Sequence, residues 1–101
     1  MALICDPAVI RTFRDRDTKA VFHGEFVKRL DRRTQQGARE KLKYLDSAAD
    51  LGDLMIPPSN QLESLKGDRQ GQHSIRINKQ WRVCFKWKDG DAFDVEIVDY
   101  Y

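Results

Sequence analysis

Several ionisable side chains in the carboxyl-terminal part of the chain could do phosphate chemistry without a metal ion or a covalent nucleophile. Cleavage of RNA through its own 2′-hydroxyl needs a base for the 2′ proton, cations for the crowded phosphorane, and an acid for the 5′-oxygen leaving group. A glutamate, several arginines with a lysine, and a tyrosine could supply these functions in turn. From the residues alone, a simple anion- or RNA-binding surface is favoured over catalysis. The side chains are Glu63, Lys66, Arg69, Arg76, Arg82, Tyr100 and Tyr101.

Motifs for other kinds of catalysis are missing from the sequence. The two histidines, His23 and His73, do not stand at metal-ligand spacing, and no clustered set of acids stands out as a Mg²⁺ site. The sequence has no Gly-x-Ser-x-Gly motif and no phosphate loop. We therefore expect no metal and no cofactor. His73 is expected to be a structural residue on the core face, and Cys5 and Cys84 are expected to be unpaired thiols.

The composition suits a small folded protein. The chain has 101 residues, of which 41% are hydrophobic and 34% are charged, and this is enough for one modest core. No apolar run approaches the roughly 20 residues that a membrane span needs, and no secretion signal is present. We expect no membrane association and a cytoplasmic location. Residues 1–9 are expected to form an N-terminal extension, and residues 10–101 a single domain.

Charge is strongly segregated along the chain, although the net charge is only +2. Residues 11–44 carry eleven Lys or Arg against five Asp or Glu, and residues 66–88 carry seven against one. The stretches 45–65 and 89–101 carry four and five acids and no Lys or Arg. Patches of both signs fit an anionic ligand together with a separate cationic or neutralising partner, and a merely solvated surface is the alternative.

Three segments with an alternating apolar pattern must position the candidate residues. Residues 72–78, 81–88 and 93–98 each alternate between apolar and polar side chains, which is typical of strands with one buried face. Short polar loops join them. The pattern predicts a three-stranded antiparallel meander whose apolar face is covered by helices.

The register of the second hairpin follows from keeping all apolar residues on one face. A two-residue turn at 89–90 would mix the two faces, so we predict a three-residue loop at 89–91. The predicted pairs are Trp87 with Phe93, Phe85 with Val95, Val83 with Ile97, and Lys86 with Asp94.

The first hairpin has a consequence for charge. The same logic at residues 78–80 places Ile75 opposite Val83 and Arg76 opposite Arg82. Two facing arginines repel each other, so we expect an anionic group over them. Tyr100 has the same parity as Arg82 and is expected to be its diagonal neighbour.

The amino-terminal half supplies the covering elements. We predict a short strand at 10–13 with Ile10 and Thr12 on one face, a helix capped by Asp17 and running through Phe22, and a main helix over 31–49. Apolar residues recur there at i, i+4, i+7 and i+11, and Gly37 is a possible break. One more turn is expected at 51–55 before a proline loop. The fold class is therefore α+β, a small antiparallel or mixed sheet covered on one face by N-terminal helices, with an open basic face.

The segment LESLKGDRQGQHSIRINKQWRVCF and the ending VEIVDYY resemble the HigB branch of the RelE/ParE toxin superfamily of type II toxin–antitoxin systems. The opening IRTFRDRDTKAVF and the stretch LKYLDSAADLGDL share the resemblance. It implies a compact RelE-like, microbial-RNase-like fold and cleavage of mRNA in the ribosomal A site without a metal. It also implies inhibition by a cognate HigA-like helix-turn-helix antitoxin.

The resemblance assigns roles to the candidate residues. It makes Glu63 the proposed base and Arg82 the arginine on the scissile phosphate, and it places Lys66, Arg69 and Arg76 at basic, RNA-binding positions. Relatives commonly end in Asp-Tyr-His, so the catalytic assignment extends to the ending Asp99, Tyr100 and Tyr101. Here tyrosine replaces the terminal histidine, and a phenol stays protonated at neutral pH and can donate a proton.

Alternatives remain open at this point. Glu63 could simply neutralise Lys66 three residues on, and Asp99 could orient an arginine rather than act as a base. The chain as a whole could be a catalytically weakened member that binds RNA, the ribosome or the antitoxin only. A DNA-binding module is not favoured, since the sequence shows no recognition-helix pattern.

Overall fold

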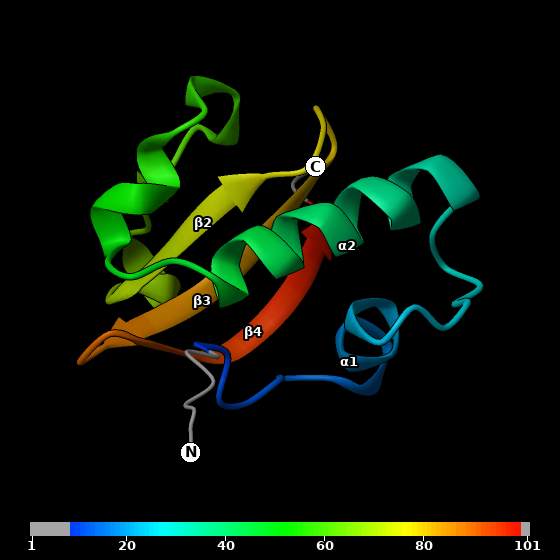
Figure 1. Ribbon diagram of the computed structural model, residues 1–101, viewed down its shortest axis with the longest axis horizontal. Coiled ribbons are helices and arrows are strands. Elements are labelled where there is room, and N and C mark those ends of the chain that lie inside the picture. The colour runs from blue at the N-terminus through cyan, green and yellow to red at the C-terminus, as the bar shows by residue number, and fades with distance from the viewer. Residues whose placement is uncertain (1–8, 100–101) are drawn as a thin grey trace, which may run out of the picture.

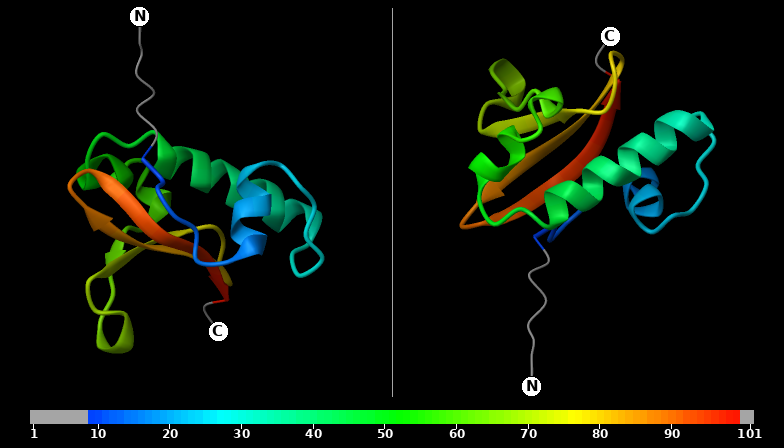
Figure 2. Two further views of the ribbon diagram at one scale, coloured as in Figure 1. Left: turned by 90° about the horizontal axis from the view of Figure 1, so that it is seen from below. Right: turned by 45° about the horizontal axis from the view of Figure 1, so that its top comes forward.

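An antiparallel sheet with strand order β1-β2-β3-β4 forms the centre of the computed structural model, which describes residues 9–99 (Figure 1). Its strands are β1 (Glu63–Ser64), β2 (Gln72–Arg76), β3 (Trp81–Lys88) and β4 (Asp91–Asp99). The predicted meander corresponds to β2, β3 and β4, and the short β1 adds an edge that the sequence analysis did not predict. In the left view of Figure 2, α2 lies above the sheet and the segment around residues 67–69 hangs below it. The α+β class is confirmed.

Two capped helices cover one face of the sheet. Helix α1 (Arg16–Phe22) begins after Asp15, whose side chain accepts a hydrogen bond from the Thr18 amide at 3.1 Å. Asp15 therefore caps α1, not Asp17 as predicted. Helix α2 (Arg32–Asp46) is capped by Asp31, the residue at which the helix was predicted to begin, and the hydrogen bonds from Thr34 lower the pKa of that carboxyl. None of the helices within residues 9–99 could cross a membrane.

Helix α2 is continuous through Gly37 but ends at Asp46, three residues before the predicted end. Its apolar stripe packs on the sheet, and a 3₁₀ turn, η1 (Leu51–Met55), follows where one more turn was expected. Two further 3₁₀ turns, η2 (Pro58–Asn60) and η3 (Gly67–Arg69), lie in the connection to β2. The fully buried side chains of the core include Leu42, Leu45, Ile75, Val83, Phe85 and Val95.

Residues 9–13 lie beside β4 without forming a regular strand. Isolated parallel bridges join Ile10 to Ala92 and Phe13 to Val95. Ile10 and Phe13 both pack against the core, whereas the predicted alternation put them on opposite faces. Val9, which the sequence analysis placed in the extension, is 5% exposed and belongs to the core cluster. Residues 1–8 lie outside the described part of the chain.

The hairpin between β3 and β4 differs from the predicted register in its first half. The turn has two residues, Asp89 and Gly90, with φ of 53° and 84°, which suits the tight hairpin turn rejected above. Trp87 pairs with Ala92 rather than with Phe93, and Lys86 pairs with Phe93 rather than with Asp94. The predicted pair of Phe85 with Val95 falls at the register shift and is not part of the ladder. A bulge then absorbs one residue at Asp94 (φ 53°), so the predicted pairing is restored by the time Val83 meets Ile97.

The first hairpin has the predicted register. Ile75 pairs with Val83 and Arg76 pairs with Arg82, as the first hairpin required. Lys86 and Asp94, although not direct partners in the ladder, form an ion pair at 3.2 Å. His73 pairs with Phe85, and its ring lies 6.1 Å from the Phe85 ring, as expected for a structural histidine on the core face.

Candidate active site

Arg82 lies on the sheet face that points away from α2, called the second sheet face below. It was expected to be open there, but it is covered. It is 5% exposed. Its Nε donates a hydrogen bond to Ser74 Oγ at 2.8 Å, and its Nη2 donates one to the Gln61 carbonyl at 2.5 Å. The same nitrogen lies 3.7 Å from Glu63 Oε1. The expected open face is therefore wrong at this point, because the Gln61 carbonyl and Glu63 of β1 lie against the guanidinium.

This enclosure has a chemical consequence. A buried charge is tolerated only when hydrogen bonds and charges compensate its lost hydration, and Ser74 and Gln61 provide two of those bonds. The guanidinium is thus held in one orientation. Because Arg82 is only 5% exposed, it offers an incoming phosphate a small accessible surface.

Glu63 stands where an incoming RNA could reach it. It lies on the edge strand β1 opposite Ser74, and its side chain is 48% exposed. No ion pair joins it to Lys66 within residues 9–99. The carboxylate faces Arg82 instead, so the alternative in which Glu63 only neutralises Lys66 is wrong. Lys66 itself is exposed.

Arg76 faces Arg82 across the ladder, as predicted, and is half-buried. It makes no ion pair or hydrogen bond with any of residues 9–99 through its side chain. The two cations avoid competing for one partner, because the bonds of Arg82 run toward Ser74 and Gln61. Arg76 therefore offers a guanidinium next to the enclosed one.

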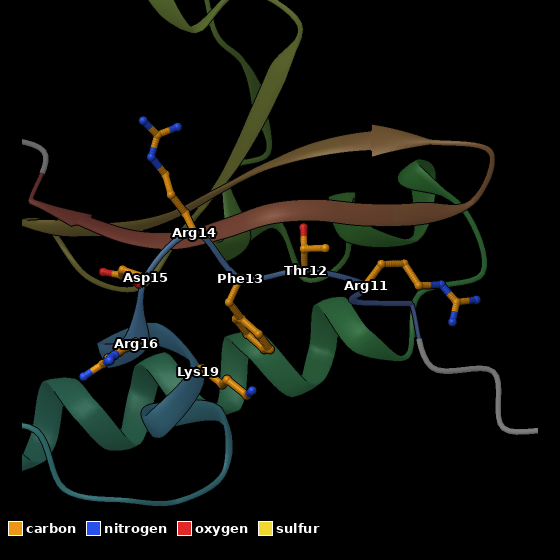
Figure 3. Close-up of a pocket in the computed structure, with 7 residues that line it drawn as sticks. All are labelled: Arg11, Thr12, Phe13, Arg14, Asp15, Arg16 and Lys19. Atoms are coloured by element: carbon orange, nitrogen blue, oxygen red, sulfur yellow. The ribbon is translucent and has the colours of Figure 1, made fainter.

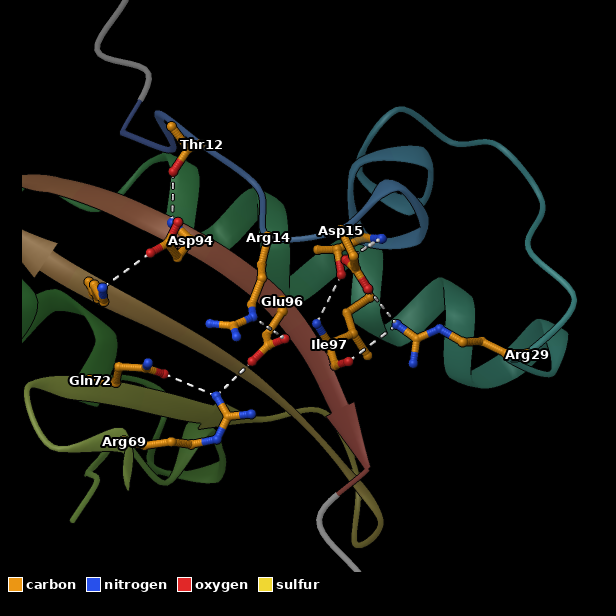
Figure 4. Close-up of polar contacts among 11 residues, drawn as sticks. Thr12, Arg14, Asp15, Arg29, Arg69, Gln72, Asp94, Glu96 and Ile97 are labelled. Carbon is orange, nitrogen blue, oxygen red and sulfur yellow. Dashed lines mark hydrogen bonds and ion pairs between the residues drawn. The ribbon is translucent and has the colours of Figure 1, made fainter. Parts of the chain in front are cut away.

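Arg69 forms an ion pair with Glu96, a residue that was not among the predicted site residues. Its Nη1 lies 2.6 Å from Glu96 Oε1 and 3.1 Å from the Gln72 amide oxygen (Figure 4). The hydrogen bond to Glu96 raises the pKa of Arg69. Arg14 approaches the other oxygen of Glu96 at 3.5 Å. Glu96 pairs with Cys84 in the ladder, and Cys84 is two residues from Arg82 on β3. The cluster is therefore at the next position along the same sheet face.

The described end of β4 has the predicted register. Asp99 pairs with Trp81 in the ladder and accepts a hydrogen bond from Gln80 Nε2 at 3.1 Å. Val98 stands opposite Arg82, which follows from the predicted pairing of Val83 with Ile97. The predicted participants Tyr100 and Tyr101 lie outside the described residues.

The other reactive groups of the described chain do not build a second centre. Cys84 is a free, buried thiol whose pKa is raised by desolvation. Across residues 9–99, no group of three or more His, Cys, Asp and Glu side chains is placed to hold a metal ion. The groups brought together on the second face are thus the carboxylates of Glu63 and Glu96 and the guanidinium groups of Arg69, Arg76 and Arg82.

A basic cleft at the start of α1 was missed by the sequence analysis. Its volume is about 430 Å³ (Figure 3). It is lined by Arg11, Thr12, Phe13, Arg14, Asp15, Arg16 and Lys19. The one available signal was the excess of basic residues in 11–44, which does not say which of them line one cleft.

Comparison with known proteins places this arrangement in context. The model of a family described as RelE-like toxin of the type II toxin–antitoxin system HigB matches residues 9–101. The chain is 50% identical over 54 residues to toxin HigB-1 of Vibrio cholerae, a match that covers 54% of this chain and 57% of that toxin. The matched stretch thus spans little more than half of that relative. Over 93 residues the chain is 28% identical to endoribonuclease HigB of Proteus vulgaris, which covers 92% of this chain and 100% of that protein.

Solved structures show the same fold. The YoeB–YefM complex from Staphylococcus aureus matches with a TM-score of 0.59 and 17% identity, covering 93% of this chain and 100% of the other. The YoeB dimer from the same organism matches with a TM-score of 0.59 and 18% identity, covering 95% and 99%. At this identity the likeness concerns the fold alone, and it confirms the expected RelE-like architecture.

Proposed function

The chain belongs to the HigB-like family of RelE-like toxins of type II toxin–antitoxin systems, and from this premise we propose that it is an endoribonuclease that inhibits translation. The proposed substrate is mRNA in the A site of the ribosome, cleaved without a metal ion. The observation that carries the proposal is the placement of an exposed carboxylate, Glu63, 3.7 Å from the fixed guanidinium of Arg82. The relative named endoribonuclease HigB, matched along its full length, supports the same activity.

The proposed reaction uses these groups in sequence. Glu63 takes the proton of the 2′-hydroxyl, whose oxygen then attacks the neighbouring phosphorus. Arg82 and Arg76 stabilise the negative charge of the phosphorane. The bond from phosphorus to the 5′-oxygen breaks, leaving a 2′,3′-cyclic phosphate and a 5′-hydroxyl. The proton for that 5′-oxygen is assigned to Tyr100 or Tyr101, which remains a prediction from the sequence.

The proposed partners follow from the same family. The ribosomal small subunit presents the mRNA, and an antitoxin of the HigA-like helix-turn-helix kind neutralises the toxin. A structural neighbour described as a complex of YoeB with YefM supports an antitoxin partner. Action on ribosomes places the protein in the cytoplasm. Lys66 and Arg69 are assigned to contacts with RNA.

The decisive experiment separates the base from the buried cation. Glu63→Gln removes the proposed base from an exposed position, whereas Arg82→Lys keeps the charge but loses the fixed fork of donors. We expect each to reduce cleavage of ribosome-bound mRNA by roughly 100-fold or more. Glu63→Gln should do so with an unchanged melting temperature. Lys43→Gln, at an exposed position on α2, is the control and should cleave like the wild type.

Several outcomes would contradict the proposal. Full activity of Glu63→Gln would remove the assigned base, and loss of wild-type cleavage in EDTA, with ribosomes held intact by polyamines, would contradict the metal-independent reaction. A wild type that binds ribosomes without cutting mRNA would point to the weakened, binding-only member. The observation that favours this second candidate, a binding-only protein, is that Arg82 is nearly enclosed and already hydrogen-bonded. Cleavage gained by Tyr101→His would then identify the missing terminal histidine as the cause.

A further inference from the structure

The cleft at the start of α1 carries more positive charge than its surroundings neutralise. Four of its lining side chains are cationic, and one, Asp15, is anionic. Asp15 is already engaged, because one oxygen accepts from the Thr18 amide and the other lies 3.3 Å from Arg29. The second acid of α1, Asp17, also pairs with Arg29, at 3.0 Å. The acids of this helix therefore face Arg29 and leave the cleft basic.

The cations of the cleft differ in how they are paired. Arg11 pairs with Asp91 at 3.1 Å, and Arg14 pairs with Glu96 at 3.5 Å. Arg16 and Lys19 make no ion pair with any residue from 9 to 99. Both side chains are exposed and stand three positions apart on α1, where they repel each other. A site with two unneutralised cations in a concave surface attracts anions.

This cleft is connected to the candidate active site through one carboxylate. Arg14 projects toward the sheet, away from Arg16 and Lys19, and reaches Glu96 (Figures 3 and 4). Glu96 in turn binds Arg69 on the second sheet face, opposite Cys84, which is two residues from Arg82 on β3. Cationic groups thus follow one another from the candidate site around the edge of β4 to α1. Carboxylates, among them Glu96 and Asp15, lie between these cations, and a chain of phosphates is the ligand class that matches the exposed cations that remain.

We propose that the cleft at the start of α1 is a second RNA-binding site, in which Arg16 and Lys19 hold backbone phosphates of an RNA that extends beyond the cleavage site. The inference rests on the proposed function in that the same RNA occupies both places. Binding here is independent of base identity, because guanidinium and ammonium groups contact phosphates rather than base edges. Arg16 and Lys19 add affinity and do not take part in the chemistry.

The test measures binding without cleavage, so that it stands apart from the activity. Fluorescence anisotropy is recorded with 2′-O-methyl RNA, which lacks the attacking hydroxyl, as a tetranucleotide and as a dodecanucleotide. The variant is Arg16→Gln with Lys19→Gln. The control is Arg33→Gln with Lys43→Gln, which removes the same two charge types from exposed positions of α2 outside the cleft.

We expect the tetranucleotide to bind wild type, variant and control alike, and the dodecanucleotide to bind the variant roughly tenfold more weakly than the wild type at low salt. The slope of log K against log salt should fall by about 1.4, since each phosphate contact to a single strand contributes about 0.7. Melting temperatures should not change.

Three results would overturn the proposal. The first is a variant that binds the dodecanucleotide like the wild type. The second is a control that loses as much affinity as the variant, which would indicate net charge rather than a site. The third is a variant that loses only antitoxin binding, which would make the cleft a protein interface. A wild type that binds the long RNA through the cleft but cleaves no mRNA would refute the proposed function and leave this inference standing.

Discussion

Replacing Glu96 with glutamine tests whether the arginine cluster on the second sheet face stabilises the fold. Glu96 is 14% exposed and receives Arg69 at 2.6 Å and Arg14 at 3.5 Å. Glutamine keeps the shape and one acceptor oxygen but removes the negative charge between two guanidinium groups. The change is therefore a nearly isosteric test of charge.

The size of the effect follows from the two contacts. A hydrogen bond to a charged group contributes about 1.5–3 kcal/mol, and roughly half of that survives with a neutral acceptor. The contact with Arg14 adds little, because that side chain is 57% exposed and exposed pairs contribute about 0–1 kcal/mol. We expect Glu96→Gln to lower the free energy of unfolding by about 1–2 kcal/mol.

The assay is urea unfolding followed by tryptophan fluorescence. For a chain of this size the expected loss moves the midpoint down by about 1 M, at an unchanged slope. Asp94→Asn is the control, because the Lys86–Asp94 pair is 54% and 41% exposed and asparagine tolerates the positive φ of residue 94. Its midpoint should hardly move. An unchanged midpoint for Glu96→Gln would show that the cluster is not held in solution. RNA affinity should change in the opposite direction, since the two freed arginines are available to phosphates.

Two further predictions concern Gly37 in α2 and the buried Cys84. Gly37→Ala should raise the free energy of unfolding by about 1 kcal/mol, seen as a melting temperature about 4–8 °C higher, because alanine favours the helix and its Cβ would lie 3.6 Å from Ile77, an ordinary contact. A lower melting temperature would mean that α2 cannot accommodate the methyl group. In a Cys5→Ser background, Cys84 should resist alkylation until urea unfolds the chain, because burial raises its thiol pKa. A raised thiol pKa adds stability that is fully present below the unfolded pKa of about 8.5 and is lost as pH rises toward the folded pKa, so urea midpoints should fall above about pH 8.5.

The alternating pattern predicted the strands and their buried face because every second side chain of a strand points to the same face and must be apolar where that face is buried. It predicted the pairing of Arg76 with Arg82 for the same reason: any slip would have exposed Ile75 and Val83. It failed at the second hairpin. There the tight turn at Asp89 and Gly90 and the bulge at Asp94 cancel each other's effect on register. Apolar alternation alone cannot distinguish a three-residue loop from a two-residue turn followed by a bulge.

The sequence predicted which residues lie near one another better than it predicted how they are covered. Arg82 and Glu63 do come together, although they stand nineteen positions apart in the chain. The enclosure of Arg82 could not be predicted, because it depends on a two-residue edge strand and on a carbonyl at Gln61, neither of which leaves a periodic pattern. Glu96 was missed because its partners come from distant parts of the chain, Arg69 from the connection between β1 and β2 and Arg14 from beside the irregular segment 9–13.

The enclosure of Arg82 bears on how the proposed enzyme would work. A guanidinium already bound to Ser74 and Gln61 loses little conformational freedom when a phosphate arrives, so its donors are preorganised for the charge that develops in the transition state. The same enclosure makes it a poor first contact for RNA. Capture of the substrate would therefore depend on the exposed cations at Lys66, Arg16 and Lys19, and stabilisation of the phosphorane on the buried one. On this division, substitutions at the exposed cations should raise KM while Arg82→Lys should lower kcat, and a fall in kcat for both classes would refute it.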